Sequence, residues 1–123
     1  DFTMELGKQV MEAFLKKHGK DIQVVYAHND DMGLGAVQAI REAGFKPGTD
    51  IKVITIDATR HAFQAMVDGD INAVVECNPL LGPLAFETLK KAIAGEALEK
   101  WIVQKDELFE MSQAAELIGL RKY

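Results

Sequence analysis

The sequence predicts an α/β fold, built on a doubly wound and mostly parallel sheet with helices on both faces. Short β-branched segments alternate along the chain with longer segments whose apolar residues recur at helical spacing, and glycine closes most of the helical segments. No linker, low-complexity stretch or internal repeat interrupts this pattern. We therefore expect residues 1–123 to form a single α/β unit.

Each expected element has a local reason. Helices are expected where apolar residues lie three and four positions apart between a capping residue and a glycine. Strands are expected where short runs are rich in Val and Ile. The expected helices are residues 3–17, 32–43, 62–67, 79–94 and 112–120, and the expected strands are residues 22–27, 51–56, 71–75 and 101–103.

Some positions carry sharper expectations. Thr3 is expected to cap the first helix, and Asp30 or Asp31 the second. The strand at 22–27 is mostly apolar, which predicts burial on both faces. Trp101 opens the weakest strand, and we expect it to pack in the core.

Composition excludes several classes of function. The 14 Lys and Arg residues against 19 Asp and Glu residues give a formal charge of −5, which argues against a nucleic-acid-binding surface. The single cysteine, Cys77, forms neither an intrachain disulfide nor a cysteine-rich zinc cage, and we expect a buried thiol. No apolar run approaches the roughly 20 residues that span a bilayer. Because the chain begins at Asp1, we expect a processed or excised product.

Polar side chains follow three of the expected strands. Asn29, Asp57 and Glu76 come after the first, second and third strand, and ligands of such sheets bind beyond the carboxyl ends of the strands. Amides and carboxylates match the neighbouring hydroxyls of a sugar, and Phe2 is a candidate to lie against the apolar face of the ring. The plainer alternative is that Asp57 caps a helix and Glu76 is a solvated strand end.

Other chemistries lack their motifs. No strand exit offers Gly-x-Gly-x-x-Gly or Gly-Lys-Ser, so a phosphate cradle is not expected. No histidine is paired with a Ser or Cys nucleophile motif, and the three histidines lie too far apart for a metal site. We therefore expect no enzyme activity, no catalytic residue, no metal ion and no cofactor.

Several motifs resemble the periplasmic sugar-binding proteins related to ribose-binding protein. Residues 29–36 carry Asn-Asp-x-Met-x-x-Gly-Ala, and residues 69–79 carry Gly-x-Ile-x-Ala-x-Val-Glu-x-Asn-Pro. Residues 53–57, Val-Ile-Thr-Ile-Asp, and the opening Asp-Phe-Thr-x-x-x-Gly fit the same family. The opening motif and Glu76 are most similar to the galactofuranose-binding branch.

This resemblance implies a fold and a function. The chain is similar to the C-terminal part of a two-lobed, type I periplasmic binding protein, in which the helix at 79–94 belongs to the other lobe. Asn29, Asp57 and Glu76 would bind sugar hydroxyls, and Phe2 would border the sugar. The ligand would be a monosaccharide, a pentose or hexose that includes the furanose form, delivered to a membrane ABC permease. The implied location is the periplasm or another extracytoplasmic space.

Two further expectations accompany this interpretation, and two rival interpretations stand beside it. Without its other lobe, the chain should bind sugar weakly or undetectably, and the amphipathic helix at 79–94 should either pack elsewhere or drive a dimer. A rival interpretation is the effector lobe of a lactose-repressor-type transcription regulator, which shares the fold. A second is a phosphoacceptor receiver domain, suggested by Asp30, Asp31 and Asp57, although the spacing of these acids does not suit it.

Overall fold

The computed structural model describes residues 2–123. Most elements begin within a few residues of their expected bounds. No helix in this described range is long and apolar enough to cross a bilayer. The α-helices are α1 (Met4–His18), α2 (Asp30–Glu42), α3 (Arg60–Val67), α4 (Gly82–Ile93) and α5 (Ala114–Leu117), the strands are β1 (Val24–Tyr26), β2 (Lys52–Asp57), β3 (Ala73–Glu76) and β4 (Leu108–Glu110), and the short 3-10 turns are η1 (Gly19–Asp21), η2 (Met111–Gln113) and η3 (Ile118–Leu120).

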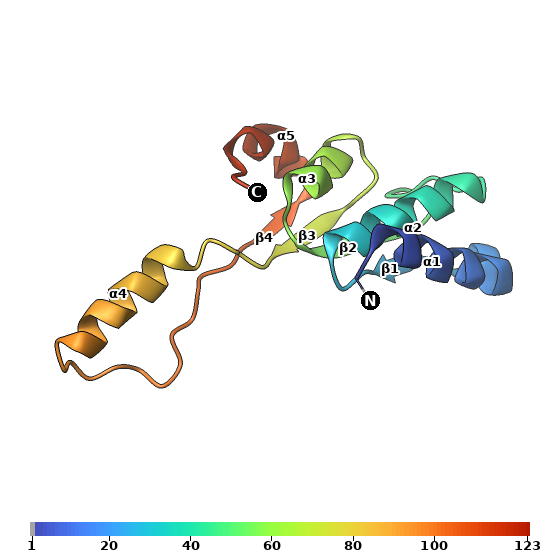
Figure 1. Ribbon diagram of the computed structural model, residues 1–123. Coiled ribbons are helices and arrows are strands. Elements are labelled where there is room, and N and C mark those ends of the chain that lie inside the picture. The colour runs from blue at the N-terminus through green and yellow to red at the C-terminus, as the bar shows by residue number, and fades with distance from the viewer. Residues whose placement is uncertain (1) are drawn as a thin grey trace.

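The strands form one open sheet in the order β1-β2-β3-β4 (Figure 1). β1, β2 and β3 run parallel, and β4 pairs antiparallel with the free edge of β3. The predicted α/β class with a mostly parallel sheet is therefore confirmed.

α1, α2 and α3 cover one face of this sheet. Val53, Thr55 and Val74 are fully buried on that face, whereas Val24 and Tyr26 on the opposite face are 57% and 55% exposed. The crossovers through α2 and α3 step the same way across the sheet, so right-handed connections place both helices on the same side (Figure 1). The predicted helices on the second face are absent from residues 2–123. The prediction that the first strand is buried on both faces is therefore wrong, because no helix of the described chain covers the face of β1 that carries Val24 and Tyr26.

α1 and α2 pack closely against each other over the sheet. Glycine permits the approach: a Cβ atom added at Gly35 would lie 2.1 Å from the backbone oxygen of Met4. One continuous core joins these helices to the sheet and to α3. Its largest fully buried apolar side chains are Ile40, Ile51, Val53, Phe63, Met66, Ile71 and Val74.

Two predicted helix caps have different outcomes. Thr3 caps α1 as expected, with its hydroxyl oxygen accepting a hydrogen bond of 3.3 Å from a backbone N–H of the first turn. α2 is capped by Asn29 rather than by Asp30 or Asp31. The reason is that the carboxylate of Asp30 turns into the protein and bonds other partners there.

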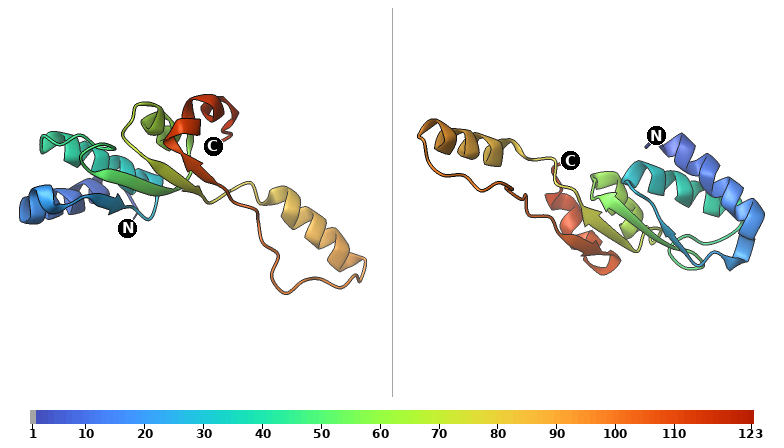
Figure 2. Two further views of the ribbon diagram at one scale, coloured as in Figure 1. Left: turned by 180° about the vertical axis from the view of Figure 1, so that it is seen from behind. Right: turned by 90° about the horizontal axis from the view of Figure 1, so that it is seen from below.

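Residues 77–107 leave the sheet as an extended arm that carries α4 (Figure 2). All of these residues are described and none of them is buried. Trp101 is 83% exposed in the loop after α4, so the predictions of a strand at 101–103 and of a core position for Trp101 are wrong. The free edge of β3 is instead taken by β4. We call residues 77–107 the α4 arm, and residues 2–76 with 108–123 the body.

Candidate functional site: the carboxyl-end rim of the sheet

The carboxyl ends of β1, β2 and β3 meet at one edge of the sheet, which we call the rim. Asp57 and Glu76 are register partners in the parallel pair of β2 and β3, so these residues lie side by side. Asn29 caps α2 just beyond the end of β1. The polar residues predicted after each strand are therefore brought to one rim, where open α/β sheets bind ligands.

Asn29 ties the start of the chain to this rim. Its side-chain oxygen accepts a hydrogen bond of 2.9 Å from the N–H of Met32, and its Nδ2 donates one of 3.2 Å to the carbonyl oxygen of Phe2. An amide side chain has two acceptor sites and two donor hydrogens, so Asn29 keeps one of each for a ligand. The ring of Phe2 is 75% exposed beside it and is free to lie against an apolar surface.

Asp57 leaves β2 in an unusual backbone conformation. Its φ is 122° and that of Ala58 is 66°, values that side chains other than glycine rarely adopt. Burial raises the pKa of the Asp57 carboxyl, and the negative charge of Asp31 raises it further. A hydrogen bond from the backbone of Asp30 acts in the opposite direction and lowers this pKa. Strained backbone of this kind concentrates at ligand sites. Asp57 does not cap a helix, because α3 is capped by Thr59.

Asp30 is a buried residue whose hydrogen bonds connect the elements of the rim. Its carboxylate is 1% exposed and accepts hydrogen bonds from the Thr55 hydroxyl at 2.6 Å and from the N–H and hydroxyl of Thr59 at 2.7 and 2.8 Å. These bonds join α2, β2 and the N-cap of α3. Burial raises the pKa of Asp30, and the three hydrogen bonds counter it. The sequence does not indicate this role of Asp30, because nothing local points to partners 25 and 29 residues away.

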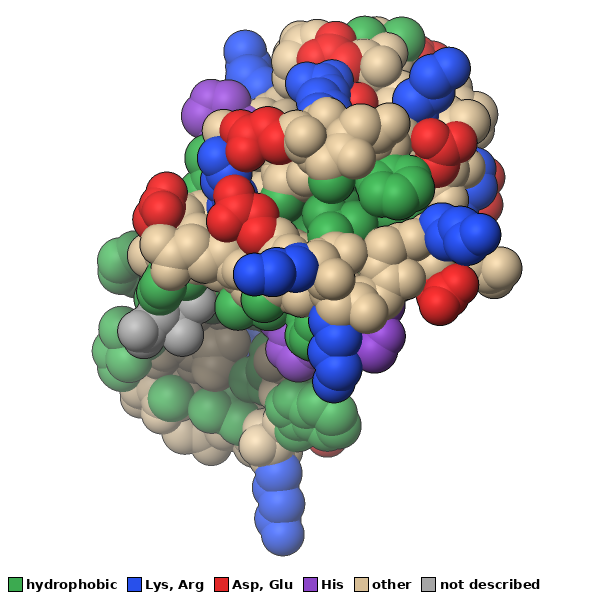
Figure 3. All heavy atoms as spheres, turned by 90° about the vertical axis from the view of Figure 1, so that its right-hand side faces the viewer, with side chains coloured by type: hydrophobic (Ala, Val, Ile, Leu, Met, Phe, Trp, Pro, Cys, Tyr) green, Lys and Arg blue, Asp and Glu red, His purple; other side chains and the backbone are tan. Residues whose placement is uncertain are grey.

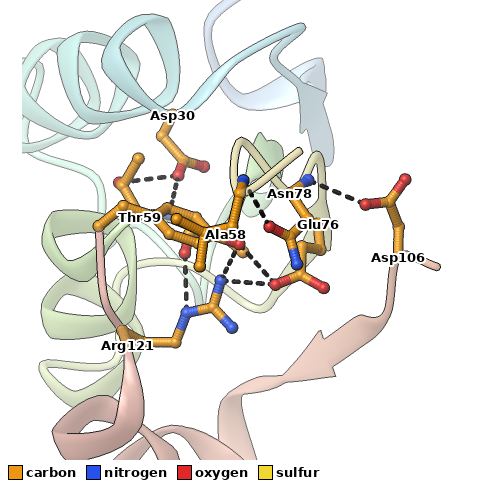
Figure 4. Close-up of polar contacts among 9 residues, drawn as sticks. Asp30, Ala58, Thr59, Glu76, Asn78, Asp106 and Arg121 are labelled. Atoms are coloured by element: carbon orange, nitrogen blue, oxygen red, sulfur yellow. Dashed lines mark hydrogen bonds and ion pairs between the residues drawn. The ribbon is translucent and has the colours of Figure 1, made fainter. Parts of the chain in front are cut away.

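Glu76 is held from the C-terminal end of the chain (Figure 4). Its Oε1 accepts hydrogen bonds from Arg121 Nη2 at 2.7 Å and from the Tyr123 hydroxyl at 2.5 Å. Burial would raise the pKa of the Glu76 carboxyl, but the hydrogen bonds from Tyr123 and Arg121 and the charge of Arg121 together lower it. Glu76 is only 7% exposed, so the alternative of a solvated strand end is wrong.

Nothing in the sequence indicates Arg121 or Tyr123 as rim residues. Both lie in a tail with neither motif nor capping pattern, and they reach Glu76 across 45 and 47 positions of chain. The backbone N–H of Arg60 donates to the carbonyl oxygen of Tyr123 at 2.8 Å, which fixes the tail against α3. Only the folded chain places them there.

The segment that leaves the body after Glu76 and the segment that returns at residues 106–107 run side by side at the base of the α4 arm. The N–H of Glu76 donates to the carbonyl oxygen of Glu107 at 2.7 Å, and the N–H of Asn78 donates to the Asp106 carboxylate at 2.8 Å (Figure 4). Cys77 lies between these bonds and is exposed, so the expectation of a buried thiol is wrong. The cause is that no part of the described chain covers these two segments.

The chemistry of the rim is that of hydrogen-bond acceptors beside one aromatic ring. Within residues 2–123, no three His, Cys, Asp or Glu side chains are grouped to hold a metal ion. Two carboxylates and one amide instead place acceptors and a donor at neighbouring strand ends. Such a set suits a ligand with several adjacent hydroxyl groups, because each hydroxyl both donates and accepts.

A separate apolar groove of about 300 Å³ lies between α1 and β1. Leu6, Val10, Phe14 and Tyr26 are among the side chains that line it. Figure 3 looks onto this end of the molecule, where charged and apolar side chains both reach the surface. The groove carries almost no polar group, so it does not share the chemistry of the rim.

The motifs and the fold together match a known family. The profile of the periplasmic binding protein domain matches residues 3–97 of the chain. The chain belongs to this family. The resemblance that the motifs of the sequence indicate is thereby confirmed.

Relatives within the family bind sugars according to their names. The chain is 46% identical over 125 residues to the galactofuranose-binding protein YtfQ of Escherichia coli (strain K12), an alignment that covers 99% of this chain and 39% of that protein. It is 38% identical over 119 residues to the fructose import binding protein FruE of Bifidobacterium longum (strain NCC 2705), which covers 96% and 36%. The chain thus spans about two fifths of the length of these relatives.

Solved structures of periplasmic binding proteins share the fold. A galactofuranose-binding protein matches with a TM-score of 0.92 at 46% identity, over 99% of this chain and 42% of the other. The arabinose-binding component of an ABC transporter from Shewanella sp. ANA-3, bound to α- and β-L-arabinofuranose, matches with a TM-score of 0.89 at 41% identity, over 99% and 41%. The chain therefore has the architecture of one lobe of a type I periplasmic binding protein.

Proposed function

We propose that the rim binds a monosaccharide, which the complete protein delivers to a membrane ABC permease. The observation that carries this proposal is the register pairing of Asp57 with Glu76, next to Asn29 at the start of α2. The sugars named for the relatives, galactofuranose and arabinofuranose among them, favour a pentose or hexose in its furanose form. The chain acts by binding and not by catalysis.

Each rim residue has a part in this recognition. Asp57 and Glu76 accept hydrogen bonds from ring hydroxyls, and charged acceptors make the stronger bonds. Asn29 accepts from one hydroxyl and donates to another with the groups that its capping bonds leave over. The exposed ring of Phe2 covers the apolar face of the sugar.

The chain works as one lobe of a two-lobed protein in the periplasm. Its length, about two fifths that of the relatives, and the unburied α4 arm both support this. We propose that α4 packs in the other lobe and that the two segments at the base of the α4 arm are part of the hinge. Closure of two lobes buries a ligand between them, and a single lobe leaves the sugar exposed to water. This chain alone should therefore bind sugar with a dissociation constant on the order of 1 mM or weaker.

A titration of the ¹⁵N-labelled chain followed by NMR tests the site at this affinity. D-ribose, L-arabinose and D-galactose at millimolar concentration should shift the amide signals of Asn29, Asp57 and Glu76, with glycerol as the control polyol. Asp57→Asn should abolish the shifts. Asp21→Asn, an exposed acid at the opposite edge of the sheet, should keep them. Shifts confined to other parts of the chain would contradict the proposed sugar site, and micromolar affinity would contradict the expectation that a single lobe binds weakly.

In the absence of another lobe, we propose that the chain dimerises through α4. The supporting observation is a groove of about 480 Å³ along this helix, lined by Leu81, Leu84, Leu89 and Ile102 among others. Sedimentation velocity should show a concentration-dependent dimer that Leu89→Lys weakens. A single monomeric species at high concentration would contradict the dimer without affecting the sugar proposal.

A further inference from the structure

We propose that Arg121 and Tyr123 are positioning residues of the rim: they hold Glu76 as an ionised acceptor that offers one oxygen, Oε2, to a ligand hydroxyl. The ligand part of this inference rests on the proposed sugar binding. The clamp itself, defined as the side chains of Arg121 and Tyr123 on Glu76, stands on the geometry of the chain alone.

The clamp occupies one oxygen of the carboxylate and leaves the other open. Oε1 of Glu76 accepts from Arg121 and from the Tyr123 hydroxyl, and Arg121 also bonds the Tyr123 hydroxyl. No described residue donates a hydrogen bond to Oε2, which Figure 4 shows directed away from Arg121. With Oε1 occupied, a ligand hydroxyl has one acceptor at a fixed place. The hydroxyl hydrogen of Tyr123 is committed to Glu76 and does not reach the ligand.

Arg121 is itself rigidly held. Its side chain is 11% exposed, and the guanidinium carbon lies 5.0 Å from the ring centroids of Phe63 and Phe109 and 4.6 Å from that of Tyr123. Aromatic faces attract a guanidinium, and this group does not lose its proton in proteins. The positive charge beside Glu76 is therefore fixed in both place and protonation.

The same guanidinium connects two strand exits. Arg121 Nε donates to the carbonyl oxygen of Ala58 at 3.0 Å, while its Nη2 bonds Glu76. Ala58 directly follows Asp57 and shares its strained backbone. One side chain thus sets the position of the Glu76 carboxylate and of the turn that carries the Asp57 carboxylate. A ligand that bridges the two acids depends on the spacing that Arg121 imposes.

The pKa of Glu76 distinguishes a clamp on its carboxylate from a role of Arg121 and Tyr123 in stability alone, because a role in stability alone would leave this pKa unchanged. Hydrogen bonds from Tyr123 and Arg121 lower the pKa of Glu76, and burial together with Glu76 raises the pKa of Tyr123 to about 12. The ¹³C carboxyl signal of Glu76 should be titrated in the ligand-free chain. Tyr123→Phe should raise the pKa of Glu76, and Tyr26→Phe, which removes the other tyrosine hydroxyl of the chain, should leave it unchanged. Equal pKa values of Glu76 in both variants would overturn the clamp.

Sugar binding then tests the positioning. The dissociation constant of the most strongly bound of the three sugars should rise about tenfold in Tyr123→Phe and in Arg121→Lys, because a charge-assisted contact loses its geometry. Tyr26→Phe and Arg41→Lys, which changes an arginine paired with Asp70 away from the rim, should bind as the unaltered chain does. Circular dichroism confirms that each variant folds.

The outcomes separate this inference from the proposed function. If the unaltered chain shows sugar-induced shifts at the rim and Tyr123→Phe and Arg121→Lys bind equally well, the positioning role is overturned and the sugar site stands. If the unaltered chain shows no such shifts, both the proposed function and the positioning of a ligand are overturned. The titration of Glu76 then still tests whether Arg121 and Tyr123 hold this carboxylate.

Discussion

The body and the α4 arm carry helices of similar amphipathic character and bury them to opposite extents. α3 has four buried residues among its eight, whereas α4 has none among its twelve. Both helices begin with favourable signals, Thr59 as a cap for α3 and Pro83 in the first turn of α4. Apolar spacing therefore specifies that a helix forms and which face is apolar. It does not specify what that face packs against, which depends on parts of the fold far away in sequence.

The largest expected difference between the two regions lies in their phenylalanines. Phe63 is fully buried, with its ring 5.1 Å from that of Phe109, while Phe86 in α4 is 67% exposed. Phe63→Ala should lower the free energy of unfolding by about 3–5 kcal/mol, through lost burial and the cavity left behind. Phe86→Ala should change it by less than about 0.5 kcal/mol. Urea unfolding followed by circular dichroism measures both.

This pair of variants can break the comparison. A large loss of stability in Phe86→Ala would mean that α4 is packed against something in solution, a second copy of the chain included. Repeating the measurement at ten times the protein concentration identifies that case, because the stability of a dimer depends on concentration.

Substitution of a glycine should also have different effects in the body and in the α4 arm. A Cβ atom at Gly35 would lie 2.1 Å from the backbone oxygen of Met4, and that backbone belongs to a helix that cannot give way easily. Gly35→Ala should therefore lower the free energy of unfolding by about 3 kcal/mol, at the upper end of the overpacking range. Gly82→Ala, at the start of α4, meets no atom within 4 Å and should change stability by less than about 1 kcal/mol. Equal effects of the two substitutions would contradict the close approach of α1 to α2.

The sequence predicted those features that depend on local chemistry. The alternation of helices and strands, the cap at Thr3 and the placement of Asn29, Asp57 and Glu76 at strand exits all follow from neighbouring residues. The last strand was misplaced because a pairing partner is chosen by the free edge of β3 and not by the Trp-Ile-Val run at 101–103. The exposed face of β1 was missed because strand composition reports how apolar a strand is and not what covers it.

The sequence predicts that Asn29, Asp57 and Glu76 lie at the rim, but it does not predict the hydrogen bonds that hold these residues there. Strand order brings Asp57 and Glu76 together, and that order follows from short right-handed crossovers. The contact of Arg121 with Glu76 depends instead on how the C-terminal tail folds back over α3. No periodicity or spacing encodes such a contact. The site residues themselves remain a prediction that the sugar titration tests.

Acid should weaken the body through Glu76, which lies where the body passes into the α4 arm. The hydrogen bonds of Arg121 and Tyr123 lower the folded pKa of Glu76 below its ordinary value of 4.5. Its contribution to stability is therefore complete above pH 4.5 and is lost as the pH falls through the folded pKa. Glu76→Gln should cost about 1.5 kcal/mol at pH 7 and progressively less as the pH falls below 4.5. Urea midpoints of both proteins across this range give the difference, and a gap that does not change with pH would contradict an ionised Glu76.

The smallest effect is expected at Trp101 in the α4 arm. This residue is 83% exposed, so Trp101→Ala should change the free energy of unfolding by less than about 0.5 kcal/mol. Trp101 is the single tryptophan of the chain, so its fluorescence reports on the arm alone. Acrylamide should quench it almost as well in the native chain as in urea. Protection from quenching that grows with protein concentration would show the arm being covered by a second copy. Protection at every concentration would place the arm against its own body and remove the contrast between the two regions.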